Sequence, residues 1–233
     1  MHAKIHVDLC VPAIRYERSL YMKQKIEYFY SAHSAYAYIG SRKLSQICKA
    51  HDCVLEHRPV SLSPVVEAVG ELPFADRTQA HVDYFFGREV ERWAEMRGVE
   101  ILNHRPTYHD NSLDLSNGML IAAIEQNADI DTLAEAILQA HWRDDIDLSD
   151  AKSLAVVAER QGINAAPLLE AALSTPIQAI HQANTAEAIQ RKVFGSPTYF
   201  LNDDMFYGQD HLEMIQRALQ MPFAPHRFYN PPV

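Results

Sequence analysis

The sequence has no excess of positive charge: its 233 residues include 21 lysines and arginines against 30 aspartates and glutamates, a formal net charge of −9. Nucleic-acid binding needs clustered cations that neutralise phosphates, so we exclude nucleic acid as the main partner. No apolar run approaches the roughly 20 residues of a membrane helix. The short N-terminal apolar run is bounded by Asp8 and Arg15, which argues against a signal peptide. We therefore expect a soluble, cytoplasmic protein without a membrane partner.

Cysteine is also scarce. Cys10, Cys48 and Cys53 make an odd count with no C-x-x-C pair, which argues against a disulfide framework and is typical of a reducing compartment. We interpret Cys48 and Cys53 as small core residues. Internal repeats and low-complexity segments are absent. Hydrophobic residues make up 48% of the chain, enough for the core of one large domain or two small ones.

The stretch 25–40, KIEYFYSAHSAYAYIG, organises the rest of the chain. Its aromatic and β-branched residues predict a buried strand over 26–31. After a polar turn, apolar residues at helical spacing predict a helix over 35–51. Backbone N–H groups and the positive end of the helix dipole converge on this turn, so it can hold an anion such as a thiolate. The simpler role of Ser31 or Ser34 is to cap the helix. A nucleophile elbow is disfavoured because the glycines of G-x-S-x-G are missing.

The elements that follow alternate in type. A second strand is predicted over 53–60, and the β-α-β order favours parallel pairing through a right-handed crossover. Residues 61–175 are predicted to be mostly helical, with helices over 83–97, 117–126, 131–142 (capped by its first residue, Asp131), 150–161 and 165–173. A helix over 185–191 precedes a hairpin of strands over 196–201 and 205–207. The last predicted helix spans 211–220 and is capped by Asp210.

Assembled in order, these elements predict an α/β protein with a thioredoxin-like four-stranded mixed sheet and a large inserted all-helical domain. We predict an N-terminal extension over 1–24 and a thioredoxin-like domain over 25–61 and 185–221. The inserted helical domain spans 62–184, and a proline-rich tail spans 222–233.

A second motif lies far down the chain: FGSPT at 194–198, followed by FYGQD at 206–210. Together with FYSAHSAYAYIG, with ERWA at 91–94 and with AHW at 140–142 followed by Asp145-Ile146, it resembles the 2-hydroxychromene-2-carboxylate isomerase family. That family is a relative of the kappa-class glutathione transferases and of disulfide oxidoreductases with a helical insert. The resemblance covers about Ile26 to Leu219 and leaves out the N-terminal extension.

The resemblance implies that Ser34 is the active residue. It stands at the position of the first cysteine of the redox relatives, and Ala37 stands at the second. Because neither is a cysteine, dithiol–disulfide exchange at this site is excluded. The implied role of Ser34 is to hold the thiol of bound glutathione and to help ionise it, aided by the helix N-terminus.

The second motif implies the remaining glutathione contacts. Pro197 is expected to follow a cis peptide bond, which would turn the N–H and C=O of Ser196 outward to pair with the cysteinyl backbone of glutathione. Gln209 and Asp210 resemble the pair that receives the γ-glutamyl end, where Asp210 would accept from its ammonium group. A helix cap at Asp210 is compatible with that role.

The sequence departs from the family pattern at three positions. Ala35 stands where the family usually has proline, His33 where it is often apolar, and Asp76 near a position that is often asparagine. These departures leave the exact substrate open. A Ser34–His33 dyad is disfavoured because adjacent residues in a turn rarely point at each other, so a supporting or substrate-facing role for His33 fits better.

Other polar residues are weaker candidates. His104, His109 and Asp110 match no standard set of metal ligands, so we predict a solvated loop there and no metal site. Asn111 and Asn117 are candidates to face a substrate from the helical domain.

The first functional hypothesis is therefore a glutathione-dependent isomerase of conjugated aromatic oxo-acids, in aromatic-compound degradation. The glutathione thiolate would add reversibly to the conjugated double bond, and rotation and elimination would give the isomer. A kappa-like glutathione transferase or peroxidase is the second hypothesis, and a non-catalytic thioredoxin-like binding module is the third. The resemblance also implies a homodimer.

Overall fold

In the computed structural model, which describes residues 23–232, the four strands form one mixed sheet in the order β2-β1-β3-β4. The first strand pairs parallel with the second and antiparallel with the third, which pairs antiparallel with the fourth. This confirms the predicted fold class. The predicted N-terminal extension lies almost entirely outside the described residues. The strands are β1 (Lys25–Tyr30), β2 (Val54–Pro59), β3 (Thr198–Leu201) and β4 (Asp204–Tyr207).

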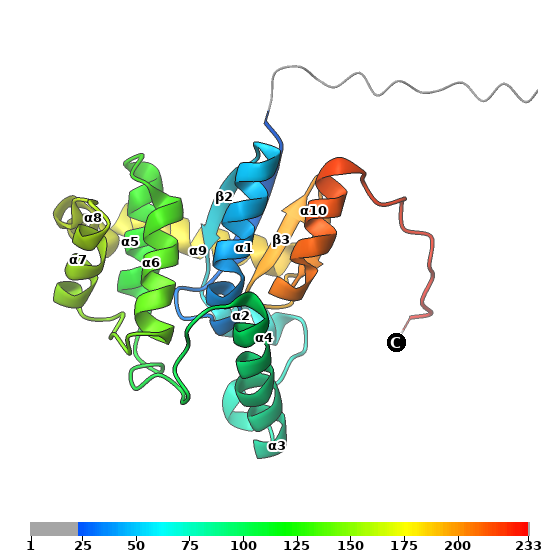
Figure 1. Ribbon diagram of the computed structural model, residues 1–233, viewed down its shortest axis with the longest axis horizontal. Helices are drawn as coiled ribbons and strands as arrows, with labels where there is room; N and C mark the ends of the chain where they lie inside the picture. Colours follow the sequence, from blue (N-terminus) through cyan, green and yellow to red (C-terminus); the bar gives the residue numbers. More distant parts are fainter. Residues whose placement is uncertain (1–22, 233) are drawn as a thin grey trace, which may run out of the picture.

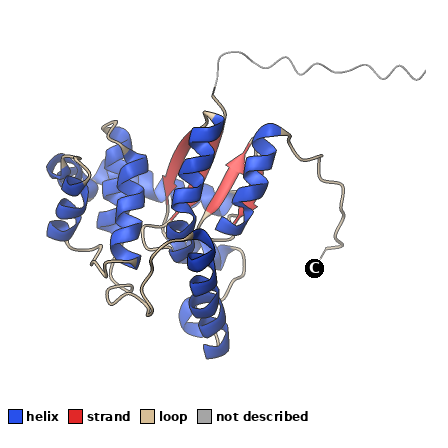
Figure 2. Ribbon diagram, viewed as in Figure 1, coloured by secondary structure: helices blue, strands red, loops and turns tan. Residues whose placement is uncertain are grey.

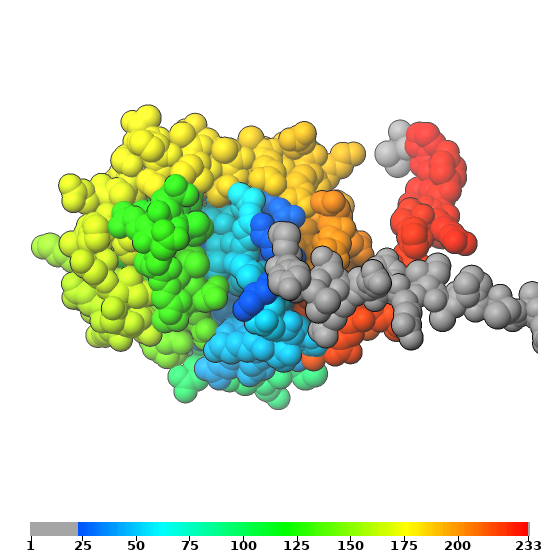
Figure 3. Space-filling model, turned by 90° about the horizontal axis from the view of Figure 1, so that it is seen from above, coloured from blue at the N-terminus to red at the C-terminus, as the bar shows by residue number. Residues whose placement is uncertain are grey.

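Helices cover both faces of the sheet because the side chains of β1 alternate between them. Ile26, Tyr28 and Tyr30 enter a large core under α1 (Ala35–His51) and α10 (Leu212–Gln220). Phe29 enters a smaller core with Phe200, closed by α9 (Thr175–Gln190). Seen from above, α9 lies along the face opposite to α1 and α10 (Figure 3). The strands are thus sandwiched between helices (Figure 2).

The helical insertion forms two groups (Figure 1). One group packs beside the sheet, with α6 against α1, and the other projects below it. The first group is α5 (Asp114–Glu125), α6 (Ile130–Trp142), α7 (Ala151–Arg160) and α8 (Ala165–Ala172). The second is α2 (Leu62–Ala68), the 3-10 turn η1 (Phe74–Asp76), α3 (Gln79–Asp83), the π-helical turn η2 (Tyr84–Arg88) and α4 (Glu89–Arg97). None of the described helices is long and apolar enough to cross a membrane.

Helices α5 and α8 pack closely against each other at Gly118. A Cβ atom at Gly118 would lie 2.2 Å from the backbone oxygen of Ala172 and 2.9 Å from its carbonyl carbon. The amide of Gln178 donates to that same oxygen at 2.8 Å. Only glycine therefore fits at this crossing.

Three boundary predictions were wrong. The helix predicted over 185–191 is the end of α9, which begins ten residues earlier with a proline in its first turn. The predicted cap Asp131 lies inside α6, and Asp129 is the cap because its side chain accepts from the backbone N–H of Thr132. Asp210 does not cap α10: it lies in the 3-10 turn η3 (Gln209–His211), and His211 occupies the N-cap position.

Candidate functional site

Ser34 caps helix α1, as predicted for one of the two serines. Its Oγ accepts a hydrogen bond from the backbone N–H of Ala37 at 3.2 Å. The same hydroxyl donates to the backbone oxygen of Ser196 at 3.0 Å. Ser34 is 7% exposed. A buried hydroxyl therefore stands at the positive end of α1 and bonds to a residue 162 positions away in sequence.

The two sequence motifs meet at this point. The Ser196–Pro197 peptide bond is cis, as predicted. The Oγ of Ser196 accepts from the backbone N–H of Ser31 at 3.1 Å, and Gly208 donates to the oxygen of Pro197 at 2.9 Å. Ser196 itself is partly exposed. The turn between β1 and α1 and the segment before β3 thus form one hydrogen-bonded unit.

The helical insertion holds the same turn from the other side. The backbone N–H of Ala32 donates to Asn117 Oδ1 at 3.1 Å, and Trp142 Nε1 donates to the backbone oxygen of His33 at 2.7 Å. Asn117 is 1% exposed and also donates to the oxygen of Val60 at 3.3 Å. The prediction that Asn117 faces a substrate is therefore wrong: its amide joins two buried backbone segments. Asn111 is exposed and donates to Asp147.

The Gln209–Asp210 pair divides between core and surface. Gln209 is 1% exposed and packs on Gly40 of α1, where a Cβ atom would lie 2.7 Å from the Gln209 Cβ. Arg97 donates from Nε to Gln209 Oε1 and from Nη2 to its backbone oxygen, both at 2.9 Å. The Nε2 of Gln209 is buried without a partner among the described residues. Asp210 is exposed.

Replacing Arg97 by leucine should lower the free energy of unfolding by about 1–3 kcal/mol. The substitution leaves two acceptors of the buried Gln209 unpaired, and buried unpaired groups cost that much. The matched control is Arg92→Leu, because Arg92 lies on the same helix, is half exposed and forms its ion pair with Glu89 at the surface. That control should cost about 0.5 kcal/mol or less. Equal losses in urea unfolding would show that Arg97 does not support Gln209.

Three imidazoles lie in a row next to this site, which the sequence did not predict. We call His33, His109 and His141 the histidine row. The ring of His109 lies 4.6 Å from that of His33 and 5.2 Å from that of His141. Hydrogen-bonding distances join His109 Nδ1 to His141 Nε2 (2.9 Å) and His33 Nδ1 to Ser31 Oγ (2.9 Å). The row is assembled from a turn, a loop and helix α6, so no local spacing could indicate it.

Burial keeps the histidine row uncharged. Burial, with smaller contributions from neighbouring imidazoles and Arg105, lowers the pKa of His33 to about 4 and the pKa of His109 to about 2. Burial also lowers the pKa of His141. At neutral pH these rings are therefore neutral, and each has one donor and one acceptor nitrogen.

The protein should lose stability as the pH falls from about 7 to about 4. The unfolded chain takes up a proton at His33 near pH 6.5, whereas the folded protein does so only near pH 4. The contribution of His33 to the free energy of unfolding is therefore complete above the pKa that it has in the unfolded chain. This contribution is lost as the pH falls toward the pKa in the folded protein, by up to roughly 3 kcal/mol. Urea unfolding at pH 7 and at pH 4.5 measures the loss. The loss of stability between the two pH values should be smaller in His33→Gln than in wild-type protein, and it should be unchanged in the exposed control His104→Gln. The same pH dependence in all three proteins would contradict it.

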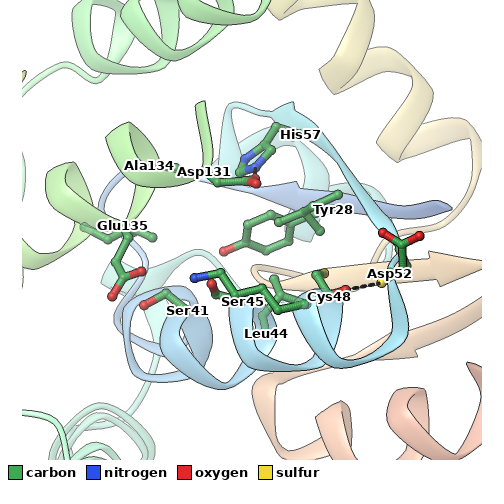
Figure 4. A pocket seen from close by; sticks show the side chains of 14 residues that line it. Tyr28, Ser41, Leu44, Ser45, Cys48, Asp52, His57, Asp131, Ala134 and Glu135 are labelled. Carbon is green, nitrogen blue, oxygen red and sulfur yellow. Dashed lines mark hydrogen bonds and ion pairs between the residues drawn. The ribbon is translucent and has the colours of Figure 1, made fainter. Parts of the chain in front are cut away.

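The described residues hold no group of three or more His, Cys, Asp or Glu arranged to bind a metal ion. A cavity of about 220 Å³ lies elsewhere, between α1, β2 and α6, and contains none of the predicted site residues (Figure 4). Cys48 and Cys53 are partly buried on its wall, and the buried hydroxyl of Tyr28 lies there with no hydrogen-bond partner in the part of the chain that the structure describes.

Comparison with known proteins agrees with this architecture. The family model of the DSBA-like thioredoxin domain matches residues 25–220. The chain is similar to a 2-hydroxychromene-2-carboxylate isomerase from Pseudomonas putida, 26% identical over 196 residues, which cover 83% of this chain and 93% of that protein. A solved structure of such an isomerase has a TM-score of 0.72 at 23% identity, covering 84% of this chain and 94% of the other. The cytosolic disulfide reductase DsbM from Pseudomonas aeruginosa with GSH has a TM-score of 0.58 at 16% identity, covering 85% and 93%. The predicted resemblance is thus confirmed.

Proposed function

The chain belongs to the family of DSBA-like thioredoxin domains, and from that premise we propose that it is a glutathione-dependent isomerase of conjugated aromatic oxo-acids, of the 2-hydroxychromene-2-carboxylate type. One observation carries the proposal. A serine hydroxyl, and no thiol, stands at the N-terminus of α1 and bonds to the residue before the cis-proline.

The chemistry of the residues present separates this chain from disulfide oxidoreductases. Disulfide exchange needs a thiolate that attacks and a thiol that leaves. Ser34 and Ala37 supply neither. A hydroxyl at a helix N-terminus can instead donate a hydrogen bond to a sulfur anion and lower the pKa of its thiol.

The residues around Ser34 fit glutathione as a bound cofactor. Ser34 would hold the thiol, the partly exposed Ser196 backbone the peptide, and the exposed carboxylate of Asp210 the ammonium group. The unpaired Nε2 of Gln209 supports the fit, because a buried amide donor without a partner is satisfied by an acceptor-rich ligand. When bound, glutathione would supply a soft thiolate nucleophile for reversible addition to the conjugated double bond.

An aromatic surface beside the first turn of α1 supports an aromatic substrate. Phe74, Tyr84, Phe85 and Phe86 are each at least 37% exposed. The hydroxyl of Tyr36, two residues after Ser34, donates to the backbone oxygen of Phe85 and ties this segment to α1. Exposed large apolar side chains that gather in one place are typical of a binding surface. The homodimer implied by the resemblance stays a prediction.

The proposal is tested by calorimetry with glutathione and then by an isomerisation assay. Micromolar to millimolar binding, followed by glutathione-dependent interconversion of 2-hydroxychromene-2-carboxylate and its open-chain isomer, would support it. Binding without isomerisation, but with conjugation to electrophiles, would favour a kappa-like transferase. If the protein bound no glutathione, both enzymatic proposals would fail and a non-catalytic thioredoxin-like module would remain.

A further inference from the structure

We propose that His109 is a specificity-determining residue of this isomerase, whose Nε2 accepts a hydrogen bond from a hydroxyl group of the aromatic substrate. The inference rests on the proposed function and names the substrate group that the site selects. It is carried by the histidine row, which lies against the turn that contains Ser34.

Hydrogen bonding fixes which nitrogen of His109 carries the proton. The Nδ1 of His141 lies 3.2 Å from the backbone oxygen of Ile146, which can only accept, so this nitrogen is protonated. The Nε2 of a neutral His141 is then an acceptor. His109 Nδ1, 2.9 Å away, must donate to it. The Nε2 of a neutral His109 is consequently left with a lone pair and no proton.

That lone pair is available to a ligand. Among the described residues, no group hydrogen-bonds to the Nε2 of His109. This atom is not one of the buried polar atoms without a partner, so solvent reaches it. His141 is 1% exposed and takes up the opposite edge of the ring. The ring also meets the indole of Trp142 edge-on at 5.4 Å. The Nδ1 edge of the His109 ring is therefore held by His141, and the Nε2 edge is open to a ligand that can donate a hydrogen bond.

The surroundings keep this acceptor unprotonated. The charged groups near it are the Arg105–Asp110 ion pair of the same loop, and the carboxylates of Asp145 and Asp147 lie near His141. Arg105 opposes protonation of His109 and Asp110 favours it, but burial and the two other imidazoles dominate and lower its pKa. The acceptor role should hold from about pH 5 upward.

The position of the row connects it to the proposed reaction. His33, whose ring lies 4.6 Å from that of His109, immediately precedes Ser34. Ser31, whose Oγ lies 2.9 Å from His33 Nδ1, also donates its backbone N–H to Ser196 Oγ, so the row adjoins the cis-proline segment as well. A substrate held at the thiol site would therefore have its ring near the row. Opening the cyclic hemiketal of a 2-hydroxychromene-2-carboxylate gives a conjugated 2-oxo acid with an ortho-hydroxyphenyl group. Both forms carry a hydroxyl donor, which a neutral imidazole accepts and a charged imidazolium would not. No proton needs to be transferred to His109 in this role.

The first test compares two competitive inhibitors of the isomerisation, 2-hydroxycinnamate and cinnamate, which differ only in the ortho-hydroxyl group and have no ketone with which to form the hemiketal ring. Wild-type protein with glutathione should bind the hydroxylated inhibitor roughly 10- to 100-fold more tightly, because a site built to bind a hydroxyl rejects an analogue without one. In His109→Phe this preference should fall to near unity. The matched control His104→Phe changes an exposed histidine of the same loop and should keep the preference. An unchanged preference in His109→Phe would overturn the inference.

A second readout does not depend on turnover. Nitrogen-15 NMR of the imidazoles should find His109 with its proton on Nδ1, and adding 2-hydroxycinnamate should shift the Nε2 resonance of His109. Cinnamate, which lacks the hydroxyl, should not. His141→Phe should remove the preference for the Nδ1–H tautomer. If wild-type protein did not interconvert 2-hydroxychromene-2-carboxylate and its open-chain isomer, the proposed function would fail, and these shifts would still decide the role of His109. A proton on Nε2 in wild-type protein, or no shift with 2-hydroxycinnamate, would overturn it.

Discussion

Ser34→Ala should lower the turnover number of the proposed isomerase by roughly 10²- to 10³-fold. The reason is that the single hydroxyl proton of Ser34, which is donated to the Ser196 oxygen in the free protein, would turn to the sulfur of bound glutathione, and removing one such donor costs that much. In wild-type protein the thiol pKa of bound glutathione should lie below that of the free thiol. In the variant it should return toward about 8.5. Ultraviolet absorbance of the thiolate against pH measures this directly.

Loss of the helix cap must be separated from loss of chemistry. Ser34→Ala removes the bond to Ala37 and should lower stability by about 1 kcal/mol. Asn164→Ala removes a comparable cap from α8, where Asn164 accepts from Ala166 at 3.3 Å. That control should lose similar stability and no turnover. If Ser34→Ala bound glutathione with an unchanged thiol pKa and full turnover, the assigned role of Ser34 would be wrong.

Gly118→Ala should lower the free energy of unfolding by about 3 kcal/mol or more. A methyl group at this position would overlap the backbone oxygen of Ala172, so α5 and α8 must move apart. The backbone cannot move away as the end of a flexible side chain can. Overpacking of this kind therefore gives one of the larger losses in free energy of unfolding among core substitutions. The displacement also pulls Ala172 from the amide of Gln178. Thermal and urea unfolding both report the loss.

The matched control is Gly87→Ala in the π-helical turn η2. A Cβ atom there meets nothing within 4 Å. Alanine should therefore stabilise the protein by about 0.5–1 kcal/mol, because it reduces the freedom of the unfolded chain. A Gly118→Ala protein as stable as this control would mean that α5 and α8 are not packed as described.

The fold was predictable where the local hydrophobic pattern of a segment matches the face that the segment buries in the folded protein. The strand over 26–31 and the helix over 35–51 match β1 and α1 within a residue, because a buried strand and an amphipathic helix have distinct periods. The predicted ends of elements were wrong where a single local hydrogen bond decides at which residue a helix begins. Asp129 and Asp131 are equally good cap types, and only the bond to Thr132 distinguishes them.

The site was predictable only in its two motifs. The sequence predicted the cis bond before Pro197 through a resemblance, and the structure adds that Ser34 and Ser196 are bonded. The groups that hold the site lie far from it in sequence. Arg97 reaches Gln209 across 112 positions, and Asn117 reaches Ala32 across 85. A side-chain contact at such a separation leaves no periodic signal, so one sequence cannot reveal it.

The hydrogen bonds by which Asn117 and Trp142 hold the turn between β1 and α1 have a consequence for protein engineering. Cutting out the helical insertion to obtain a minimal thioredoxin scaffold would leave the Ala32 N–H and the Val60 oxygen without partners. It would also sever α9, which runs unbroken from Thr175 to Gln190 across the predicted domain boundary at 184 and 185. The insertion is therefore not a removable module. Grafting a new specificity onto this protein should proceed by exchanging surface side chains, not whole domains.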